Sequence, residues 1–125
     1  MASGKAQSPV RHATPDAELF EGSFAPDTAN APTTLRGSGF TVTYVSAGRW
    51  TVTIQGIGGA TVVKAIAGVQ LNAAAASPID VSIIGATASS SGNLTFDILY
   101  RVNAVATNIA ANANNRVHFS VTVRP

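Results

Sequence analysis

Residues 39–55, GFTVTYVSAGRWTVTIQ, decide how this chain is expected to fold. Apolar side chains alternate with threonines in two runs, and a Gly-containing turn separates the runs. The apolar positions are Phe40, Val42 and Tyr44 in the first run, and Trp50, Val52 and Ile54 in the second. Strict alternation of β-branched and aromatic residues is typical of a half-buried strand, and a short turn joins two such strands into a hairpin. The segment therefore predicts an all-β domain with Phe40, Val42, Trp50, Val52 and Ile54 in its core.

Further strand patterns follow the hairpin. The runs cover residues 61–71, 79–83, 94–102 and 116–124. The run 61–71 is apolar on both faces, so a helix is the alternative there, but its β-branched content and Gly68 favour a strand. Phe96 and Phe119 fall on the apolar faces of the last two runs and join the predicted core. Several short strands separated by turns predict an antiparallel β-sandwich or jelly roll over residues 39–125.

Residues 1–38 have a different pattern. They contain four of the six prolines and show no long apolar alternation. We therefore expect an extended N-terminal arm. Within it, residues 14–20 could form one helical turn with Thr14 as its N-cap. Leu19, Phe20 and Phe24 are its apolar residues and the candidates for binding a neighbouring subunit. The alternative is a terminus without fixed contacts, which is common at the ends of domains.

Composition narrows the class of protein. Charged residues make up 11% of the chain, less than half the usual share of about 25%. A surface this poor in charge suits a subunit that packs against copies of itself, and it also suits an ordinary sandwich domain. The formal net charge is +2, and the cations are scattered rather than clustered, which argues against a nucleic-acid partner. Cysteine is absent, so disulfides and thiolate metal sites are excluded.

No stretch of the sequence has the apolar core of a signal peptide or the length of a membrane span. We therefore expect a protein that is made in the cytoplasm and has no membrane partner.

The search for catalytic chemistry gives little. His12 and His118 lie in separate regions, so they do not form the converging His and carboxylate set that metal binding or acid–base catalysis needs. Asp80 and Asp97 could face each other as a glycosidase pair, or Asp97 could pair with a nearby arginine. No nucleophile elbow or phosphate-binding glycine motif accompanies them. The sequence predicts no catalytic residue, metal, cofactor or small-molecule substrate, and hence no enzyme.

Two segments resemble small structural proteins of tailed-bacteriophage virions. They are GSGFTVTYVSAGRWTVTI, residues 37–54, and ANANNRVHFSVTVRP, residues 111–125. Many such proteins share an opening hairpin of the form GFTVTR.G.G.YTVTF and a terminal strand that reads A-D/N-NRVHF. The likeness covers about the last 90 residues, and the arm lies outside it.

The resemblance implies a capsid decoration, or cement, protein on the outer surface of the virion. Such a subunit would form a homotrimer, bind the major capsid protein and stabilise the shell, without nucleic acid, membrane or substrate. A tail, collar or fibre component is the near alternative. A carbohydrate-binding sandwich, in which Trp50 or Tyr100 stacks on a sugar, is the rival from another class. It requires those aromatic rings to be exposed.

Overall fold

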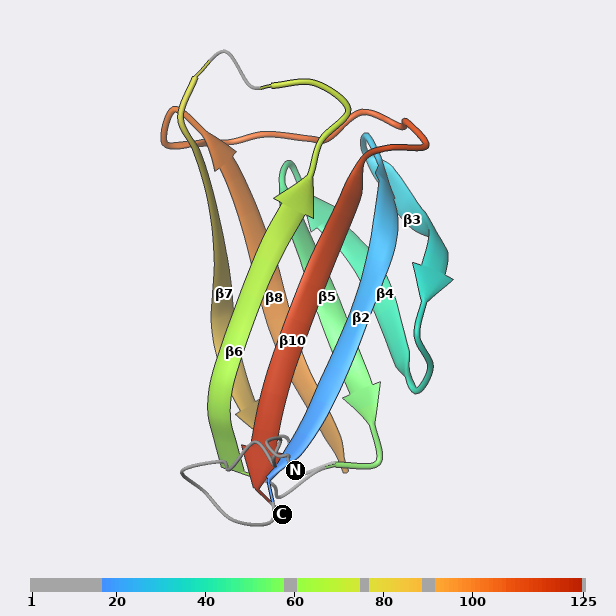
Figure 1. Cartoon of the computed structure of the whole chain (residues 1–125), viewed down its shortest axis with the longest axis vertical. Coiled ribbons are helices and arrows are strands. Elements are labelled where there is room, and N and C mark those ends of the chain that lie inside the picture. The colour runs from blue at the N-terminus through green and yellow to red at the C-terminus, as the bar shows by residue number, and fades with distance from the viewer. Residues whose placement is uncertain (1–16, 58–60, 75–76, 89–91, 125) are drawn as a thin grey trace, which may run out of the picture.

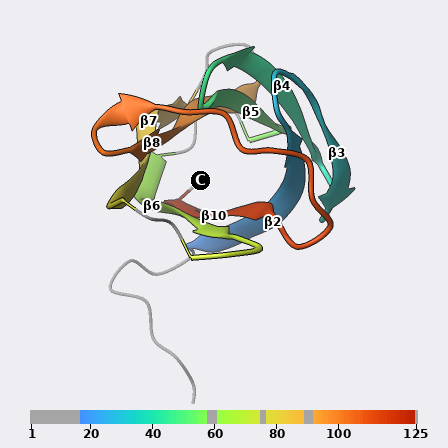
Figure 2. The same ribbon diagram turned by 90° about the horizontal axis from the view of Figure 1, so that it is seen from above.

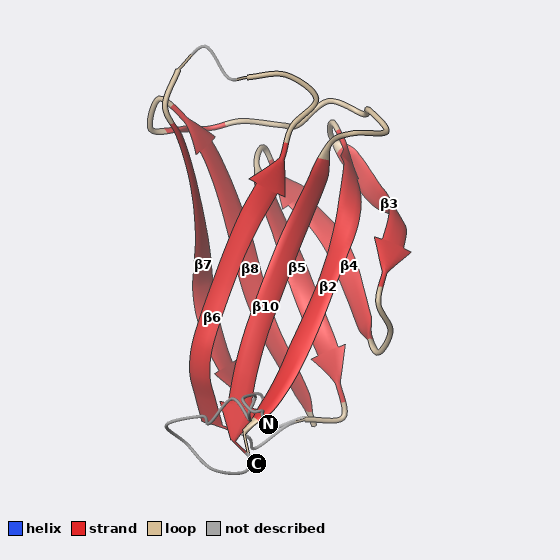
Figure 3. Ribbon diagram, viewed as in Figure 1, coloured by secondary structure: helices blue, strands red, loops and turns tan. Residues whose placement is uncertain are grey.

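The computed structural model describes residues 17–57, 61–74, 77–88 and 92–124, and these residues form strands and loops (Figures 1 and 3). The strands make two antiparallel sheets that pack together as a β-sandwich, which confirms the predicted class. The first sheet has the order β3 (Asn30–Arg36), β2 (Glu18–Asp27), β10 (Arg116–Arg124) and β6 (Thr61–Gln70). The second has the order β4 (Phe40–Ser46), β5 (Arg49–Gln55), β8 (Asn93–Val102) and β7 (Ile79–Ala88), with the short β9 (Val105–Ala106) beside β8. The finer jelly-roll topology stays a prediction.

The two sheets approach each other along both sides. Viewed along the strands, they curve around a common interior, so that β6 lies next to β7 and β3 lies next to β4 (Figure 2). The strands β6 and β7 run in opposite directions at this junction (Figure 1). Strands β6 and β7 are therefore neighbours along this side of the sandwich, although they belong to different sheets.

The hairpin predicted for residues 39–55 is confirmed. Strands β4 and β5 pair in the expected register, with Val42 opposite Val52 and Tyr44 opposite Trp50. The turn depends on Gly48, which has a φ of +68°. An added Cβ there would lie 2.3 Å from the carbonyl oxygen of Tyr100, so the turn packs directly on the backbone of β8.

Both sheets contribute aromatic side chains to one core. Phe24 of β2 meets Trp50 of β5 with ring centroids 5.5 Å apart. Phe119 of β10 lies edge to face with Phe40 at 5.0 Å and with Phe96 at 5.6 Å. The predicted core residues Trp50, Val52, Ile54, Phe96 and Phe119 are buried, and Phe40 and Val42 are half-buried and packed against them.

The predicted arm is wrong over residues 18–36. These residues form β2 and β3, and β2 pairs with β10 in the first sheet, so the boundary at residue 38 does not separate an arm from the sandwich. Residues 18–20 are part of a strand and not of a helical turn. Residues 1–16 lie outside the described part of the chain, and the prediction for them is untested.

The sequence pattern does not reveal strand β2, because a glycine takes one of the inward positions where an apolar side chain would be expected. A Cβ at Gly22 would lie 2.6 Å from Cζ of Phe119 and 2.7 Å from Cε1 of Phe40. Real Cβ contacts are never this short, so the two rings occupy the space that a side chain would need. Pro32 is compatible with strand structure because it lies in β3, an edge strand of the sheet. Pro26 lies beyond the last residue pair of β2 with β10.

The other sequence predictions can be placed on the described residues. The apolar run 61–71 forms β6 and not a helix. The Ala- and Asn-rich stretch 104–115 is a loop that includes β9. Asn108 in this loop accepts hydrogen bonds from the Tyr44 hydroxyl at 2.9 Å and from the Gly48 amide at 3.3 Å. The loop thereby holds the turn of the β4–β5 hairpin in place.

Candidate functional site

Among the described residues, the side chains that could ligate a metal ion do not gather in one place. No three His, Cys, Asp or Glu side chains among them come together in a way that could hold a metal ion. His118 is exposed on the outer face of β10, and His12 lies outside the described residues. In the part of the chain that the structure covers, no helix is able to cross a membrane. The outer faces and edges of the sandwich are therefore the candidate binding surfaces.

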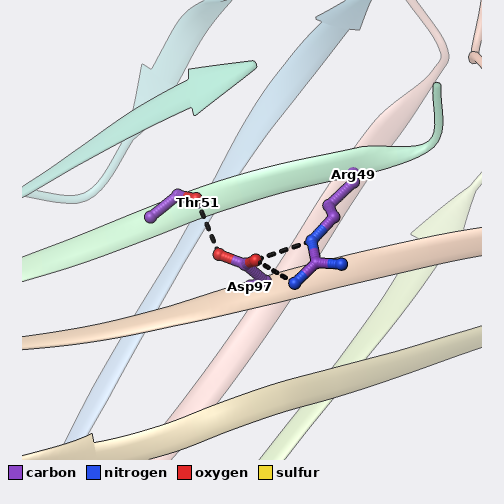
Figure 4. Close-up of polar contacts among 3 residues, drawn as sticks. All are labelled: Arg49, Thr51 and Asp97. Carbon is purple, nitrogen blue, oxygen red and sulfur yellow. Dashed lines mark hydrogen bonds and ion pairs between the residues drawn. The ribbon is translucent and has the colours of Figure 1, made fainter. Parts of the chain in front are cut away.

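The outer face of the second sheet is electrically neutral and fully paired. Asp97 of β8 accepts hydrogen bonds from Nε of Arg49 at 2.7 Å and from Oγ1 of Thr51 at 2.6 Å, both on β5 (Figure 4). Nη2 of Arg49 lies 2.6 Å from the same carboxylate. Asp80 forms the second ion pair, with Arg101. The prediction that Asp97 pairs with a nearby arginine is confirmed, and each aspartate is bound to its own arginine.

The outer face of the first sheet holds a different charge pattern. Its cations are Arg36 on β3, Arg116 and Arg124 on β10, and Lys64 on β6. The two ion pairs among the described residues both lie on the second sheet. None of these four cations therefore has a described carboxylate within ion-pair distance. Glu18, Glu21 and Asp27 on β2 are the acidic residues of this sheet, and strand register places Glu21 opposite Ser120. The strands of the first sheet therefore carry four cationic and three acidic side chains, an excess of one positive charge.

A groove of about 560 Å³ crosses this face. Its lining comes from all four strands of the sheet and from the start of the β3–β4 turn. The side chains at its surface are Glu21 and Ser23 of β2, Arg36 of β3, His118 and Ser120 of β10, and Ile66 of β6. Gly68 of β6 stands opposite His118 in the register and adds no side chain, and an added Cβ there would meet open space. The absent side chain leaves the groove open beside His118.

Arg116 lies at the end of β10 behind one wall of the groove. Its side chain is buried, with only 6% of the residue exposed. It donates from Nη2 and Nε to Oγ of Ser23, at 3.0 and 3.3 Å, and from Nη2 to the carbonyl oxygen of Thr34 at 2.8 Å. Burial, and secondly the positive charge of Arg36, lower the pKa of Arg116. A buried guanidinium held by neutral oxygens retains its charge, and this charge acts on the neighbouring groove.

A second surface feature lies where the two sheets meet at β6 and β7. Four large apolar side chains are exposed on these adjacent strands: Val63 (45%), Ile66 (53%), Ile79 (41%) and Ile84 (40%). We call these four residues the β6–β7 apolar strip. Scattered apolar residues are normal on a protein surface, and four on two neighbouring edge strands make this side of the sandwich a candidate contact surface.

The predicted partner-binding residues do not form a common anchor. Leu19 is 53% exposed on the outer face of β2, whereas Phe24 is fully buried in the core. Phe20 is half-buried and packs against the core from the same face of the strand as Phe24. Only Leu19 is free to contact another molecule. The reason is the strand period, since positions 20 and 24 point inward while position 19 points outward.

The aromatic residues proposed to stack on a sugar are not at the surface. Trp50 is fully buried and Tyr100 is 5% exposed, so neither ring presents a face to a ligand. Burial also raises the pKa of Tyr100. The expectation that one of these rings forms a carbohydrate platform is therefore wrong.

Sequence reasoning missed both the groove and the apolar strip. Arg36 and His118 come together only because β2 lies between β3 and β10, and no local pattern reveals this order. The alternation of polar residues in 116–124 was a partial signal, since it placed His118 and Ser120 on an outer face. Comparison of the chain with protein-family models, with curated proteins and with solved structures gave no match.

Proposed function

We propose that this chain is a non-enzymatic structural protein of a tailed-bacteriophage virion. In this proposal it is a decoration, or cement, protein that binds the major capsid protein on the outer surface of the shell as a homotrimer. Its role is to stabilise the assembled particle, and it needs no cofactor, nucleic acid, membrane or small-molecule substrate.

The β6–β7 apolar strip carries this proposal. Val63, Ile66, Ile79 and Ile84 are each at least 40% exposed on the edge strands β6 and β7, and Ile66 also lines the groove of the first sheet. Interfaces between identical subunits have apolar centres, and burying such side chains contributes about 25 cal/mol per Å² of apolar surface. The strip is therefore suited to contact another copy of the chain, as a trimeric decoration protein requires.

The two segments that carry the resemblance also support the proposal. The hairpin motif forms β4 and β5, and the terminal motif forms β10, so the two lie in opposite sheets of the same core. Phe40 and Phe119, one from each motif, are in edge-to-face contact. The shared residues thus build a rigid scaffold, which suits a subunit that decorates a shell.

An add-back experiment tests this proposal. Purified chain is mixed with capsids of the phage that encodes it, assembled without this protein, and bound protein is measured by cosedimentation. We expect a free trimer of about 38 kDa, three times 12.7 kDa, that binds the capsids and raises the temperature at which they come apart.

Val63→Asp places a charge in the strip and should give monomers that no longer bind. The matched control is Val45→Asp, which changes a valine of similar exposure on β4, outside the strip. Monomeric wild-type protein that does not cosediment would contradict the proposal. Cosedimentation with isolated tails instead of capsids would favour the tail, collar or fibre alternative.

A further inference from the structure

We propose that the groove on the outer face of the first sheet is an anion-binding site for glutamate or aspartate side chains of an extended segment in the partner protein. Arg36 is the residue that contacts the carboxylate, and Arg116 supports it from behind. The identification of the partner as a shell protein rests on the function proposed above. The groove and its chemistry do not depend on that function.

The distribution of charge is the first argument. On the second sheet, Arg49 and Arg101 are neutralised by Asp97 and Asp80. On the first sheet, no described carboxylate lies within ion-pair distance of Arg36, although Glu21 lines the same groove. A guanidinium without a carboxylate, placed in a concave site, is ready to form a charge-assisted hydrogen bond with an incoming anion.

The buried arginine is the second argument. Arg116 donates from Nε and Nη2 to neutral oxygens of Ser23 and Thr34, and these contacts include no carboxylate. Removing an arginine from water is costly unless a counter-charge is close. An anion in the groove beside Ser23 would supply that charge and relieve the repulsion between Arg116 and Arg36. The site is therefore built to gain stability when an anion binds.

The shape of the groove identifies the kind of anion. Its lining includes no exposed aromatic ring, because Phe119 is 3% exposed, so neither a sugar nor a nucleobase finds a surface on which to stack. Ile66, which also belongs to the β6–β7 apolar strip, offers an exposed apolar side chain, and Ser120 and His118 offer polar groups. A polypeptide that alternates acidic and apolar side chains matches this combination.

Nuclear magnetic resonance of the full chain, labelled with ¹⁵N, provides the test. Two blocked hexapeptides are titrated, one alternating glutamate with valine and the other alternating glutamine with valine. We expect the glutamate peptide to shift the amides of Gly22, Gly37 and Gly68 saturably, while the glutamine peptide does not. An oligothymidylate with the same net charge should bind at least tenfold more weakly than the glutamate peptide.

Variants place the binding in the groove. Arg36→Gln should lower the affinity for the glutamate peptide about tenfold, which is the typical effect of losing one charge-assisted hydrogen bond. Arg124→Gln removes the same charge from the far end of β10 and should change affinity less than twofold. Ser120→Glu introduces a negative charge into the groove at a half-exposed position and should abolish binding, which provides a second test should Arg36→Gln fold poorly.

Several results would overturn the inference. They are equal binding of the two peptides, amide shifts confined to the second sheet, equal losses in Arg36→Gln and Arg124→Gln, or tighter binding of the oligothymidylate. If the glutamate peptide fails to bind while the chain still cosediments with capsids, the groove assignment is wrong and the proposed function stands. If the peptide binds as expected while capsids do not, the proposed function is wrong and the anion site stands.

Discussion

Phe24 of β2 and Trp50 of β5 meet edge to face across the sandwich, with ring centroids 5.5 Å apart and planes at 61°. Both side chains are fully buried. This contact joins a segment that resembles no strand by its sequence pattern to the hairpin that most clearly predicts the fold. Strand β2 (Glu18–Asp27) is therefore an integral part of the sandwich.

Truncation of Phe24 tests this role. Phe24→Ala should lower the free energy of unfolding by about 3–5 kcal/mol, because it removes a buried ring and leaves a cavity beside Trp50. Leu19→Ala in the same strand should cost less than about 1 kcal/mol, since Leu19 is 53% exposed. Urea unfolding followed by Trp50 fluorescence measures both. Equal small effects would show that residues 18–27 do not dock as described.

The turn of the central hairpin offers a second test with a matched control. Gly48→Ala should be strongly destabilising, since the new Cβ would collide with backbone atoms of Tyr100 and Thr107. Gly39 also has a left-handed conformation, with a φ of +79°, but an added Cβ there meets no atom within 4 Å. Gly39→Ala should therefore cost only the conformational strain of about 1–2 kcal/mol. Thermal unfolding of the two variants should differ clearly, and similar midpoints would contradict the contact between the turn and β8.

The hydrogen bonds of Arg116 give a third prediction. Ser23→Ala leaves Nε of the buried guanidinium without its acceptor, so we expect a loss of about 1–3 kcal/mol in unfolding free energy. Ser120→Ala serves as the control, because Ser120 is half-exposed and makes no side-chain hydrogen bond to another described residue. Chemical denaturation distinguishes the two. A neutral Ser23→Ala would mean that Arg116 is satisfied in another way.

Tyr100 gives a prediction for alkaline pH. Burial raises the pKa of its phenol, so the folded state favours the neutral form. This contribution to stability is fully present below the unfolded-state pKa of about 10 and is lost as the pH rises above it. Stability should therefore fall more steeply above pH 10 in the wild type than in Tyr100→Phe. Parallel pH profiles of the two proteins would show that the phenol is not buried.

The sequence predicts those parts of the fold that depend on local patterns. The β4–β5 hairpin and β10 follow from alternation within a few residues, and so do the buried positions of Trp50, Val52 and Phe119. Strand β2 could not be recognised in this way, because Gly22 takes an inward position and leaves the space to the ring of Phe119.

Strand order is the part that no local pattern contains. The pairing of β2 with both β3 and β10 brings Arg36, Ser23 and His118 to one groove. The proximity of β6 and β7 likewise assembles the apolar strip from two separate runs. The groove and the apolar strip therefore could not be predicted from the sequence. Their residues come together only through the order of the strands.

Electron cryomicroscopy of the virion that carries this chain tests the central claim most directly. If the chain is a capsid decoration protein, density that fits the sandwich will stand on the outer surface of the shell in threefold clusters. The β6–β7 apolar strip will then lie between subunits. Density for the chain within the tail or fibres alone, or its absence from the particle, would contradict the claim.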